Sequence, residues 1–436
     1  MSNTLSPPPK TEHRIKKIGI LFAGGPAPAA NAVISACSAA FLKNGIEVVG
    51  LRNGYSNLVE FDPEKPLEVN KDYFEVTHRF LSRSRNTQGI MIGTARANPG
   101  KKIQHPDDLT DSEKRQPLLN VYNALVSLGV EALVSIGGDD TLKTANKFKL
   151  FQETLGPDAQ RIPVVHLPKT IDNDYHGIDF TFGYFTAVEF LGTEVRNLIY
   201  DAQSTNSYFV AETMGRSAGW LAYGAAIAGE ASLVISVEDV NGDYQGEETY
   251  IDPSTGESRT RKIMNMVAIC ERIVKTMLAR EKDNKEFGVI VIAEGLAEFL
   301  PHEYLDGVSR DDHGHIQISE IDLCGIFEKQ IIAAYERETG NKRRVKGVKL
   351  GYESRCAKPH AFDVMLGSQL GVGAYRALVE QNHNGVMVSI KGQLELHYEP
   401  FENLVDPKTL VTRVRYIEPG HDFHRLARFL ETDINE

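Results

Sequence analysis

Residues 132–141 read Ala-Leu-Val-Ser-Ile-Gly-Gly-Asp-Asp-Thr, a short apolar run that ends in two glycines and two aspartates. The run Ala132–Ile136 is typical of a strand buried on both faces, because polar and apolar positions do not alternate in it. Residues 162–174 repeat the plan, since the apolar run Ile162–Leu167 leads into Pro-Lys-Thr-Ile-Asp-Asn-Asp. Each stretch therefore predicts a buried strand with charged side chains at its carboxyl end.

The order of strand, turn and helix recurs along the chain. Further apolar runs predict strands at Ile18–Ala23, Val48–Leu51, Tyr208–Thr213, Leu233–Val237, Gly288–Ala293, Val345–Leu350 and Val386–Ile390. Helical periodicity predicts a helix after Thr141 and others at Asn31–Lys43, Asn120–Leu128, Ala187–Tyr200, Ile263–Ala279, Ile326–Arg337 and Phe362–Glu380. Apolar strands that alternate with helices indicate an α/β fold whose parallel sheets are covered on both faces.

The length of 436 residues exceeds what one compact core usually holds. We therefore expect two Rossmann-like parallel-sheet domains, with the active site in the cleft between them. The expected parts are a disordered tail at 1–14, a first domain at 15–174, a second at 175–390, and an extension at 391–436 that packs back on the domains. The polar run Asn241–Lys262 predicts an exposed insertion or hairpin.

Composition narrows the class of protein. Apolar content of 42% and charged content of 25% are ordinary for a soluble globular protein, and a net charge of −11 argues against a nucleic-acid partner. The four cysteines form no CxxC pair, so neither a disulfide framework nor a zinc site is expected. The N-terminus lacks a signal peptide's apolar core, and Gly24, Gly25 and Pro26 interrupt the longest uncharged stretch. We expect a cytoplasmic protein without a membrane partner.

The two charged turns carry the chemistry. Gly137 and Gly138 allow an anion to approach the backbone, and the carboxylates that follow suit magnesium, which binds carboxylates together with substrate phosphates. The plainer alternative is a helix N-cap with a spare surface aspartate. In the second turn, Asp172 can accept a proton from an attacking hydroxyl, while Lys169 neutralises charge on the transferred group. Together the turns predict phosphoryl transfer.

Six motifs in matching order and spacing resemble the phosphofructokinase family, from about Lys17 to about Ile390. These motifs are Phe22–Pro28, Gly137–Asp140, Pro168–Asp174, Met214–Ser217, Ala293–Gly295 and Gly351–Arg355. Members that use ATP typically carry glycine where this chain has Asp140 and again where it has Lys169. The resemblance is therefore to the pyrophosphate-dependent branch.

The resemblance implies a donor site. Gly25 would contact the diphosphate through its backbone, and Asp139 would hold Mg²⁺, the implied cofactor. Lys169 would stabilise the transferring phosphoryl group, and Asp140 would repel the α-phosphate of a nucleotide. One departure lies nearby, because Ala29 follows Pro28 where many relatives have glycine.

The resemblance also implies an acceptor site for fructose 6-phosphate. Asp172 would be the general base for its 1-hydroxyl, with Thr170 nearby. The sugar phosphate would be bound by the backbone and side chains of Met214, Gly215, Arg216, Glu294, Tyr352 and Arg355. Within this set, Arg216 would clamp charge, Glu294 would bind a sugar hydroxyl, and Tyr352 with Arg355 would hold the 6-phosphate.

The implied activity is the reversible, Mg²⁺-assisted phosphorylation of fructose 6-phosphate by pyrophosphate, a glycolytic reaction. A homodimer or homotetramer is expected, although no basic residue is found around Ser207, where bacterial ATP enzymes donate an arginine across the interface. Three alternatives stay open at this level: ATP as donor, sedoheptulose 7-phosphate as a major acceptor, and a regulatory subunit that only binds sugar phosphate. The last should have lost Asp172 or Lys169, which this chain retains.

Overall fold

The computed structural model describes residues 5, 10–251, 256–305 and 320–434. Its contacts divide the chain into two compact units. Unit 1 is Met1–Thr170, Tyr175–Phe185 and Arg355–Arg413, and unit 2 is Ile171–Asp174, Thr186–Ser354 and Val414–Glu436. This division differs from the expected single boundary after Asp174, because the chain returns to unit 1 at Arg355 and to unit 2 at Val414. Most of the tail expected at 1–14 lies outside the described residues.

Unit 1 contains a seven-stranded sheet in the order β13-β12-β5-β4-β1-β2-β3. Its strands are β1 (Lys17–Ala23), β2 (Glu47–Leu51), β3 (Tyr73–Val76), β4 (Ala132–Gly137), β5 (Val164–Pro168), β12 (Val386–Lys391) and β13 (Glu395–Pro400). The inner strands pair in parallel, and the edge strands β3 and β13 pair antiparallel to their neighbours. The expected parallel sheet is thus present, with antiparallel edges that the periodicity did not predict.

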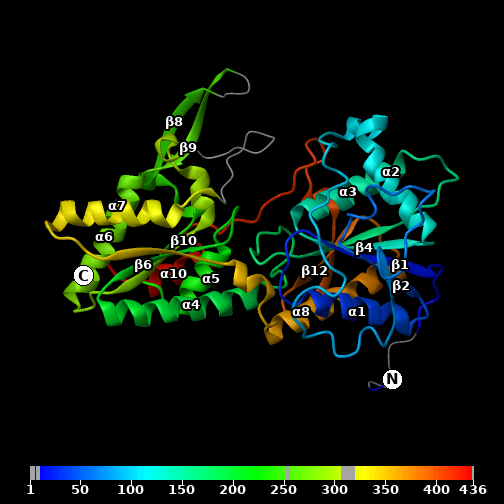
Figure 1. The fold of residues 1–436 in the computed structure, drawn as a ribbon, viewed down its shortest axis with the longest axis horizontal. Helices are drawn as coiled ribbons and strands as arrows, with labels where there is room; N and C mark the ends of the chain where they lie inside the picture. Colours follow the sequence, from blue (N-terminus) through cyan, green and yellow to red (C-terminus); the bar gives the residue numbers. More distant parts are fainter. Residues whose placement is uncertain (1–4, 6–9, 252–255, 306–319, 435–436) are drawn as a thin grey trace. The chain divides into compact units, whose positions relative to one another are not determined.

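Helices cover both faces of this sheet (Figure 1). The helices α1 (Ala30–Lys43) and α8 (Ala361–Tyr375) lie against one face, and α2 (Ser112–Ser127) and α3 (Asp139–Glu153) against the other. A short helix, α9 (Phe401–Leu404), follows β13. Gly371 brings α8 close to α1, since a Cβ built there would lie 2.5 Å from the carbonyl oxygen of Val33. This contact explains why the segment 355–413 packs with unit 1.

Unit 2 contains a four-stranded parallel sheet in the order β11-β6-β10-β7. Its strands are β6 (Tyr208–Thr213), β7 (Leu233–Ile235), β10 (Gly288–Ala293) and β11 (Val345–Leu350). The helices α6 (Met266–Lys282) and α7 (Leu323–Thr339) cover one face, and α4 (Tyr184–Thr205), α5 (Trp220–Gly229) and α10 (Asp422–Leu430) cover the other (Figure 1). None of the described helices has the length and apolar character needed to span a bilayer.

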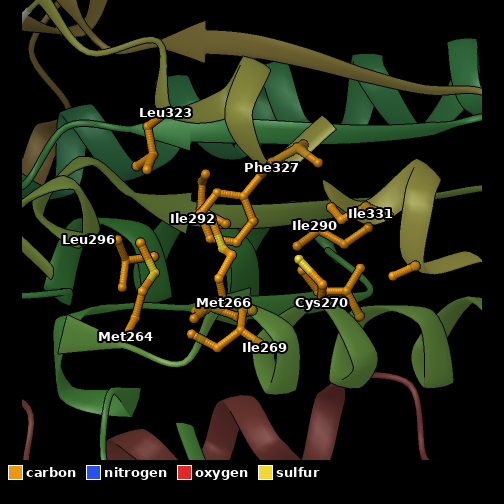
Figure 2. Close-up of a cluster of buried hydrophobic side chains, with 14 of the residues drawn as sticks. Met264, Met266, Ile269, Cys270, Ile290, Ile292, Leu296, Leu323, Phe327 and Ile331 are labelled. Carbon is orange, nitrogen blue, oxygen red and sulfur yellow. The ribbon is translucent and has the colours of Figure 1, made fainter. Parts of the chain in front are cut away.

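The core under α6 and α7 fixes a short segment that matters for the site. Phe327 of α7 and Ile269 of α6 pack with Ile290 and Ile292 of β10 (Figure 2). Leu296 joins the same cluster from the 3₁₀ helix Glu294–Phe299, and it is fully buried. Burying a leucine side chain contributes about 2 kcal/mol, so this anchor holds the 3₁₀ helix on the sheet.

The polar run at 241–262 forms most of an antiparallel hairpin, β8 (Gln245–Ile251) and β9 (Ser258–Met264), whose connection at 252–255 lies outside the described residues. The hairpin expected from the sequence is confirmed. The helix expected from Ile263 begins three residues later, at Met266, because β9 continues to Met264. Asn265 caps α6 instead, where its side-chain oxygen accepts a hydrogen bond from the backbone N–H of Ala268.

Candidate active site

Three strands of unit 1 end at the same level of the sheet. Ala23 of β1 is paired with Gly137 of β4, which is paired in turn with Pro168 of β5. In open parallel sheets, ligands bind beyond the carboxyl ends of the strands. The turn after β1, the acidic turn after β4 and the segment after β5 therefore meet at one edge.

The acidic turn joins β4 directly to α3. A Cβ built on Gly137 would lie 2.3 Å from the hydroxyl oxygen of Thr141, so only glycine fits where the chain enters the helix. Gly138 is the N-cap, and Asp139 and Asp140 are the first two residues of α3. Their carboxylates are therefore stabilised by the positive end of the helix dipole, but neither aspartate is the N-cap, so the capping alternative is wrong. Both side chains remain exposed to solvent.

The glycine turn after β1 faces this helix end. Gly24 has φ 90°, a left-handed conformation that favours glycine. Its N–H donates to the carbonyl oxygen of Ala95 (2.9 Å), and its own carbonyl accepts from the hydroxyl of Thr94 (2.7 Å). A Cβ built on Gly25 would lie 3.8 Å from the guanidinium carbon of Arg355. The turn thus brings backbone N–H groups and an arginine to the same place.

Lys169 lies between the two glycine turns. Its Nζ atom is 3.6 Å from the position of a Cβ built on Gly24 and also 3.6 Å from one built on Gly138. Its backbone N–H donates to the carbonyl oxygen of Gly137, and the side chain is buried. The missing side chains at the glycines therefore make room for the ammonium group. These residues line a cavity of about 210 Å³ together with Asp139, Asp140 and the segment 95–98.

A lysine that the sequence analysis did not single out lies behind the acidic turn. The Nζ atom of Lys143 is 3.2 Å from a carboxylate oxygen of Asp139 and 2.7 Å from one of Asp140. Burial alone would lower the pKa of Lys143, but the two carboxylates outweigh it and hold that pKa above its ordinary value. One turn further, burial and then the nearby Lys143 lower the pKa of Lys147 to about 8.

A buried histidine is connected to the acidic turn through the hydroxyl of Tyr175. The Tyr175 hydroxyl donates to the carbonyl oxygen of Gly137 at 3.0 Å. The 3.1 Å bond between Tyr175 and His166 must then have Nε2–H of His166 as its donor, because the hydroxyl proton is already used. Burial lowers the pKa of His166 to about 3, so the ring is neutral. His166 is a core residue, as expected from its place in the strand.

The predicted base lies in a turn that the C-terminal segment holds. Asp172 is half-buried, and Asn173 adopts φ 54°, which closes the turn. Arg415 donates from its backbone N–H to the carbonyl oxygen of Asp174 (2.8 Å) and from its guanidinium to that of Asn173 (2.7 Å). The indole N–H of Trp220 donates to the carbonyl oxygen of Arg415. The turn is thus anchored through its own backbone.

Unit 2 repeats the arrangement of strand ends. Thr213 of β6 is paired with Ala293 of β10 and with Leu350 of β11, so the segments that follow these three strands start side by side. These segments hold five of the predicted acceptor residues: Met214, Gly215, Arg216, Glu294 and Tyr352. The exposed Tyr352 lies in a 3₁₀ helix after β11.

Close backbone contacts fix the loop after β6. Gly215 has φ 120°, and its N–H donates to the carboxylate of Glu294 at 3.1 Å. A Cβ built on Gly295 would lie only 2.1 Å from the carbonyl oxygen of Arg216, so glycine is required there. The guanidinium of Arg216 donates to Glu298 at 2.8 Å. Arg216 is therefore held in place by an acidic partner one turn beyond Glu294.

The predicted residues thus form two sets. Gly25, Asp139, Asp140 and Lys169 gather around one cavity of unit 1, and the acceptor segments gather at one sheet edge of unit 2. Arg355 groups with unit 1 beside Gly25, whereas Tyr352, three residues earlier, groups with unit 2. The resemblance assigns both side chains to the 6-phosphate, whereas the contacts of the chain group them with different units.

Several residues that contact the predicted site residues were not predicted from the sequence. Lys143 follows Asp139 and Asp140 at four and three residues, the spacing at which helical side chains meet, and this signal was available. Thr412, whose hydroxyl donates to Asp139 at 3.3 Å, and Arg415 approach their partners from far along the chain. No local pattern marks Thr412 or Arg415, since only the tertiary fold brings them near.

The acidic turn fits a divalent metal only in part. Carboxylate oxygens are the ligands that magnesium prefers, and Asp139 and Asp140 provide them at the cavity wall. Within the described part of the chain, no group of three or more His, Cys, Asp or Glu side chains is placed to hold a metal. An ion here would need oxygens from water and from a substrate to complete its shell, which is how magnesium commonly binds beside phosphates.

Comparison with known families assigns the chain. Residues 17–378 match the family model described as Phosphofructokinase, and the chain belongs to this family. A curated relative from Thermotoga maritima, named pyrophosphate–fructose 6-phosphate 1-phosphotransferase, is 33% identical over 95% of this chain and 90% of its own length. A relative from Bacteroides thetaiotaomicron, 29% identical over 91% of this chain and 95% of its own, is named ATP-dependent 6-phosphofructokinase 3.

Solved structures agree on the fold. The pyrophosphate-dependent phosphofructokinase of Nitrosospira multiformis matches with a TM-score of 0.65 at 18% identity, covering 95% of this chain and 92% of that one. Phosphofructokinase from Saccharomyces cerevisiae matches with a TM-score of 0.66 at 22% identity over 89% of this chain, which spans 45% of the yeast chain. The α/β fold expected from the sequence is confirmed.

Proposed function

We propose that this chain transfers a phosphoryl group reversibly from pyrophosphate to the 1-hydroxyl of fructose 6-phosphate, with Mg²⁺ as cofactor. The observation that carries the proposal is the position of Lys169 between Gly24 and Gly138, beside the acidic turn. A buried ammonium group between two glycine turns suits a compact, highly charged anion. The names of the Thermotoga maritima and Naegleria fowleri relatives, both 33% identical, point the same way.

The size of the donor cavity supports a compact donor. Its volume of about 210 Å³ lies below the ~300–1,000 Å³ of pockets that enclose drug-sized ligands. Repulsion by Asp140 adds less to donor choice. Between unit charges 4 Å apart it is worth about 1 kcal/mol in water and about 4 kcal/mol at an effective dielectric of 20. The Asp140 side chain is 74% exposed and is paired with Lys143, so the lower figure, about fivefold in affinity, applies.

The transfer needs a general base, a positive group that stabilises the transferring phosphoryl group, and an acceptor sugar held in place. In this proposal Asp172 takes the proton of the 1-hydroxyl, with Thr170 nearby, as the oxygen attacks phosphorus. Lys169 stabilises the charge of the transferring group, and Gly25 offers its backbone to the phosphate left behind. Mg²⁺ bound at Asp139 would neutralise charge on the diphosphate oxygens.

The acceptor side rests on the second set of residues. Arg216, oriented by Glu298, provides the positive charge for a sugar phosphate, and Glu294 accepts from a sugar hydroxyl while it orders Gly215. Tyr352 is exposed, and in this proposal it also contacts the sugar phosphate. Arg355 lies beside Gly25, and we propose that it contributes positive charge to the phosphoryl group as well as to the sugar phosphate.

ATP is the second candidate donor, because relatives about equally distant differ in name. Sequences 29–30% identical to this chain include both pyrophosphate-dependent and ATP-dependent enzymes. Asp140 and Lys169 favour pyrophosphate through their charges, since Lys169 compensates for the contacts that an adenosine would have made.

Initial rates decide between the donors. Fructose 6-phosphate and Mg²⁺ are held constant while pyrophosphate and ATP are compared at equal concentration. Turnover with pyrophosphate and not with ATP supports the proposal, whereas turnover with ATP alone refutes it. Asp140→Gly in the same assay should gain ATP turnover by about fivefold, the size of the repulsion removed. Sedoheptulose 7-phosphate, tested as acceptor, defines the sugar range.

A further inference from the structure

The acidic turn is already paired with a positive charge. Lys143 reaches both carboxylates, at 3.2 Å from Asp139 and 2.7 Å from Asp140. Its side chain is only 23% exposed, against 59% for Asp139 and 74% for Asp140. The lysine is thus the most buried of the three side chains.

The contact with Lys143 uses an oxygen that a metal would also need. The Oδ2 atom of Asp139 accepts from the Nζ of Lys143 and from the hydroxyl of Thr412. Two hydrogen-bond donors, one of them charged, therefore compete with a cation for the same carboxylate oxygen. A positive charge next to a metal site also opposes a divalent ion by simple repulsion.

We propose that Lys143 is a positioning residue of the donor site, a resident cation that holds Asp139 and Asp140 and keeps free Mg²⁺ from binding the turn by itself. This inference rests on the proposed function. The oxygens of the incoming diphosphate supply the ligands and the negative charge that the turn lacks, so metal and donor bind together. Lys143 thereby makes metal binding conditional on the donor.

Mn²⁺ binding to the donor-free protein tests this directly. Mn²⁺ is a paramagnetic substitute for Mg²⁺, and its free fraction can be read by electron paramagnetic resonance without any turnover. Lys143→Met should bind Mn²⁺ about tenfold more tightly than the wild type, because a unit charge close to the ion is removed. An affinity that stays within twofold of the wild type would overturn the proposal.

Lys149→Met is the matched control. Lys149 lies on the same helix and also contacts two carboxylates, Glu153 and Glu402, each at 3.1 Å. Its removal should leave the Mn²⁺ affinity unchanged. A gain in Lys149→Met as large as in Lys143→Met would overturn the proposal, because net charge alone would explain both.

Three more variants locate the effect. Asp139→Asn combined with Lys143→Met should lose the gain in affinity, and Lys143→Arg should bind Mn²⁺ as the wild type does. A double variant that keeps the tight binding overturns the proposal, because the ion then binds elsewhere. Thermal melts report whether each variant folds, and Lys143→Gln repeats the test with a polar side chain.

The result separates this inference from the proposed function. A gain in Mn²⁺ affinity without turnover on pyrophosphate would leave the role of Lys143 standing and refute the choice of donor. Pyrophosphate turnover without a gain in Mn²⁺ affinity would do the reverse.

Discussion

The guanidinium of Arg415 lies 4.7 Å from the centre of the Trp220 ring, and the indole N–H donates back to the carbonyl oxygen of Arg415 at 2.9 Å. The same arginine donates to the carbonyl oxygens of Asn173 and Asp174. One residue of the C-terminal segment therefore connects the turn of the predicted base to Trp220, the first residue of α5. We infer that Arg415 and Trp220 together hold the turn that carries Asp172 in one conformation.

Replacing Arg415 by methionine should loosen that turn. A general base that is misplaced by about 1 Å costs roughly a hundredfold in rate, so kcat should fall by about 10- to 100-fold while the KM for fructose 6-phosphate changes less than about threefold. Trp220 is the only tryptophan in the chain, so its fluorescence reports the loss of the stacked guanidinium directly. Arg425→Met, which removes an exposed arginine beside Phe429, is the control and should change neither kcat nor the Trp220 fluorescence. An unchanged kcat with altered fluorescence would refute the positioning role.

The pair Arg216 and Glu298 should govern the affinity for the acceptor. Hydrogen bonds to charged groups are worth about 1.5–3 kcal/mol, so Arg216→Met should raise the KM for fructose 6-phosphate by about 10- to 100-fold. Glu298→Gln keeps the shape of the side chain but holds the Arg216 guanidinium less firmly, so the KM for fructose 6-phosphate should rise a few-fold. The exposed pair Arg337 and Glu271 offers the control Arg337→Met, for which steady-state kinetics should be unchanged. Equal effects at Arg216 and Arg337 would contradict this assignment.

Gly295→Ala should disturb the same loop through its backbone. The added methyl would lie 2.1 Å from the carbonyl oxygen of Arg216, and overpacking of this kind costs about 1–3 kcal/mol. We expect a melting temperature lower by several degrees, together with weaker sugar-phosphate binding. At Gly156 a Cβ meets nothing within 4 Å, so Gly156→Ala should melt like the wild type. Wild-type melting and KM in Gly295→Ala would show that the contact relaxes freely.

His166 should make the protein sensitive to acid. Its pKa is about 3 in the folded protein, against an ordinary value of 6.5. Well above pH 6.5 the His166 ring is neutral in both the folded and the unfolded protein. Below pH 6.5 the ring binds a proton in the unfolded chain but stays neutral in the folded protein. Stability should thus decline as the pH falls from 6.5 towards 3, by about 2 kcal/mol at pH 5.

The variant His166→Gln isolates this effect. Glutamine keeps a donor for Tyr175 but does not titrate, so its free energy of unfolding should fall by about 2 kcal/mol less than that of the wild type between pH 7 and pH 5. Urea unfolding at the two pH values measures the difference. Replacement of the exposed His78 by glutamine serves as control, and a parallel decline in the wild type and His166→Gln would remove His166 as the cause.

Sequence patterns predicted the strands and turns well because these rest on local chemistry. Apolar runs that end in glycine marked β1 and β4, and their in-register ends brought Gly24 and Gly138 to one edge as expected. The antiparallel edges β3 and β13 were missed, since direction depends on the partner strand and leaves no local signature.

Sequence patterns did not predict where the chain passes back from one unit to the other. Arg355 packs with unit 1 and Val414 begins the return to unit 2, so the division of the chain depends on contacts such as that between α1 and α8. For the same reason Arg415 and Thr412 could not be linked to Asn173 and Asp139 in advance. The contacts of Lys143 with both aspartates, by contrast, follow from helical spacing alone.

The reverse reaction is the sharpest test of pyrophosphate as the donor. Wild-type protein is incubated with fructose 1,6-bisphosphate, Mg²⁺ and inorganic phosphate, and pyrophosphate and fructose 6-phosphate are followed by ³¹P NMR. Both products should form with phosphate alone, and Asp172→Asn should form neither while it still binds the sugar phosphate. No reaction with phosphate, together with ATP formation when ADP is added, would refute pyrophosphate as the donor.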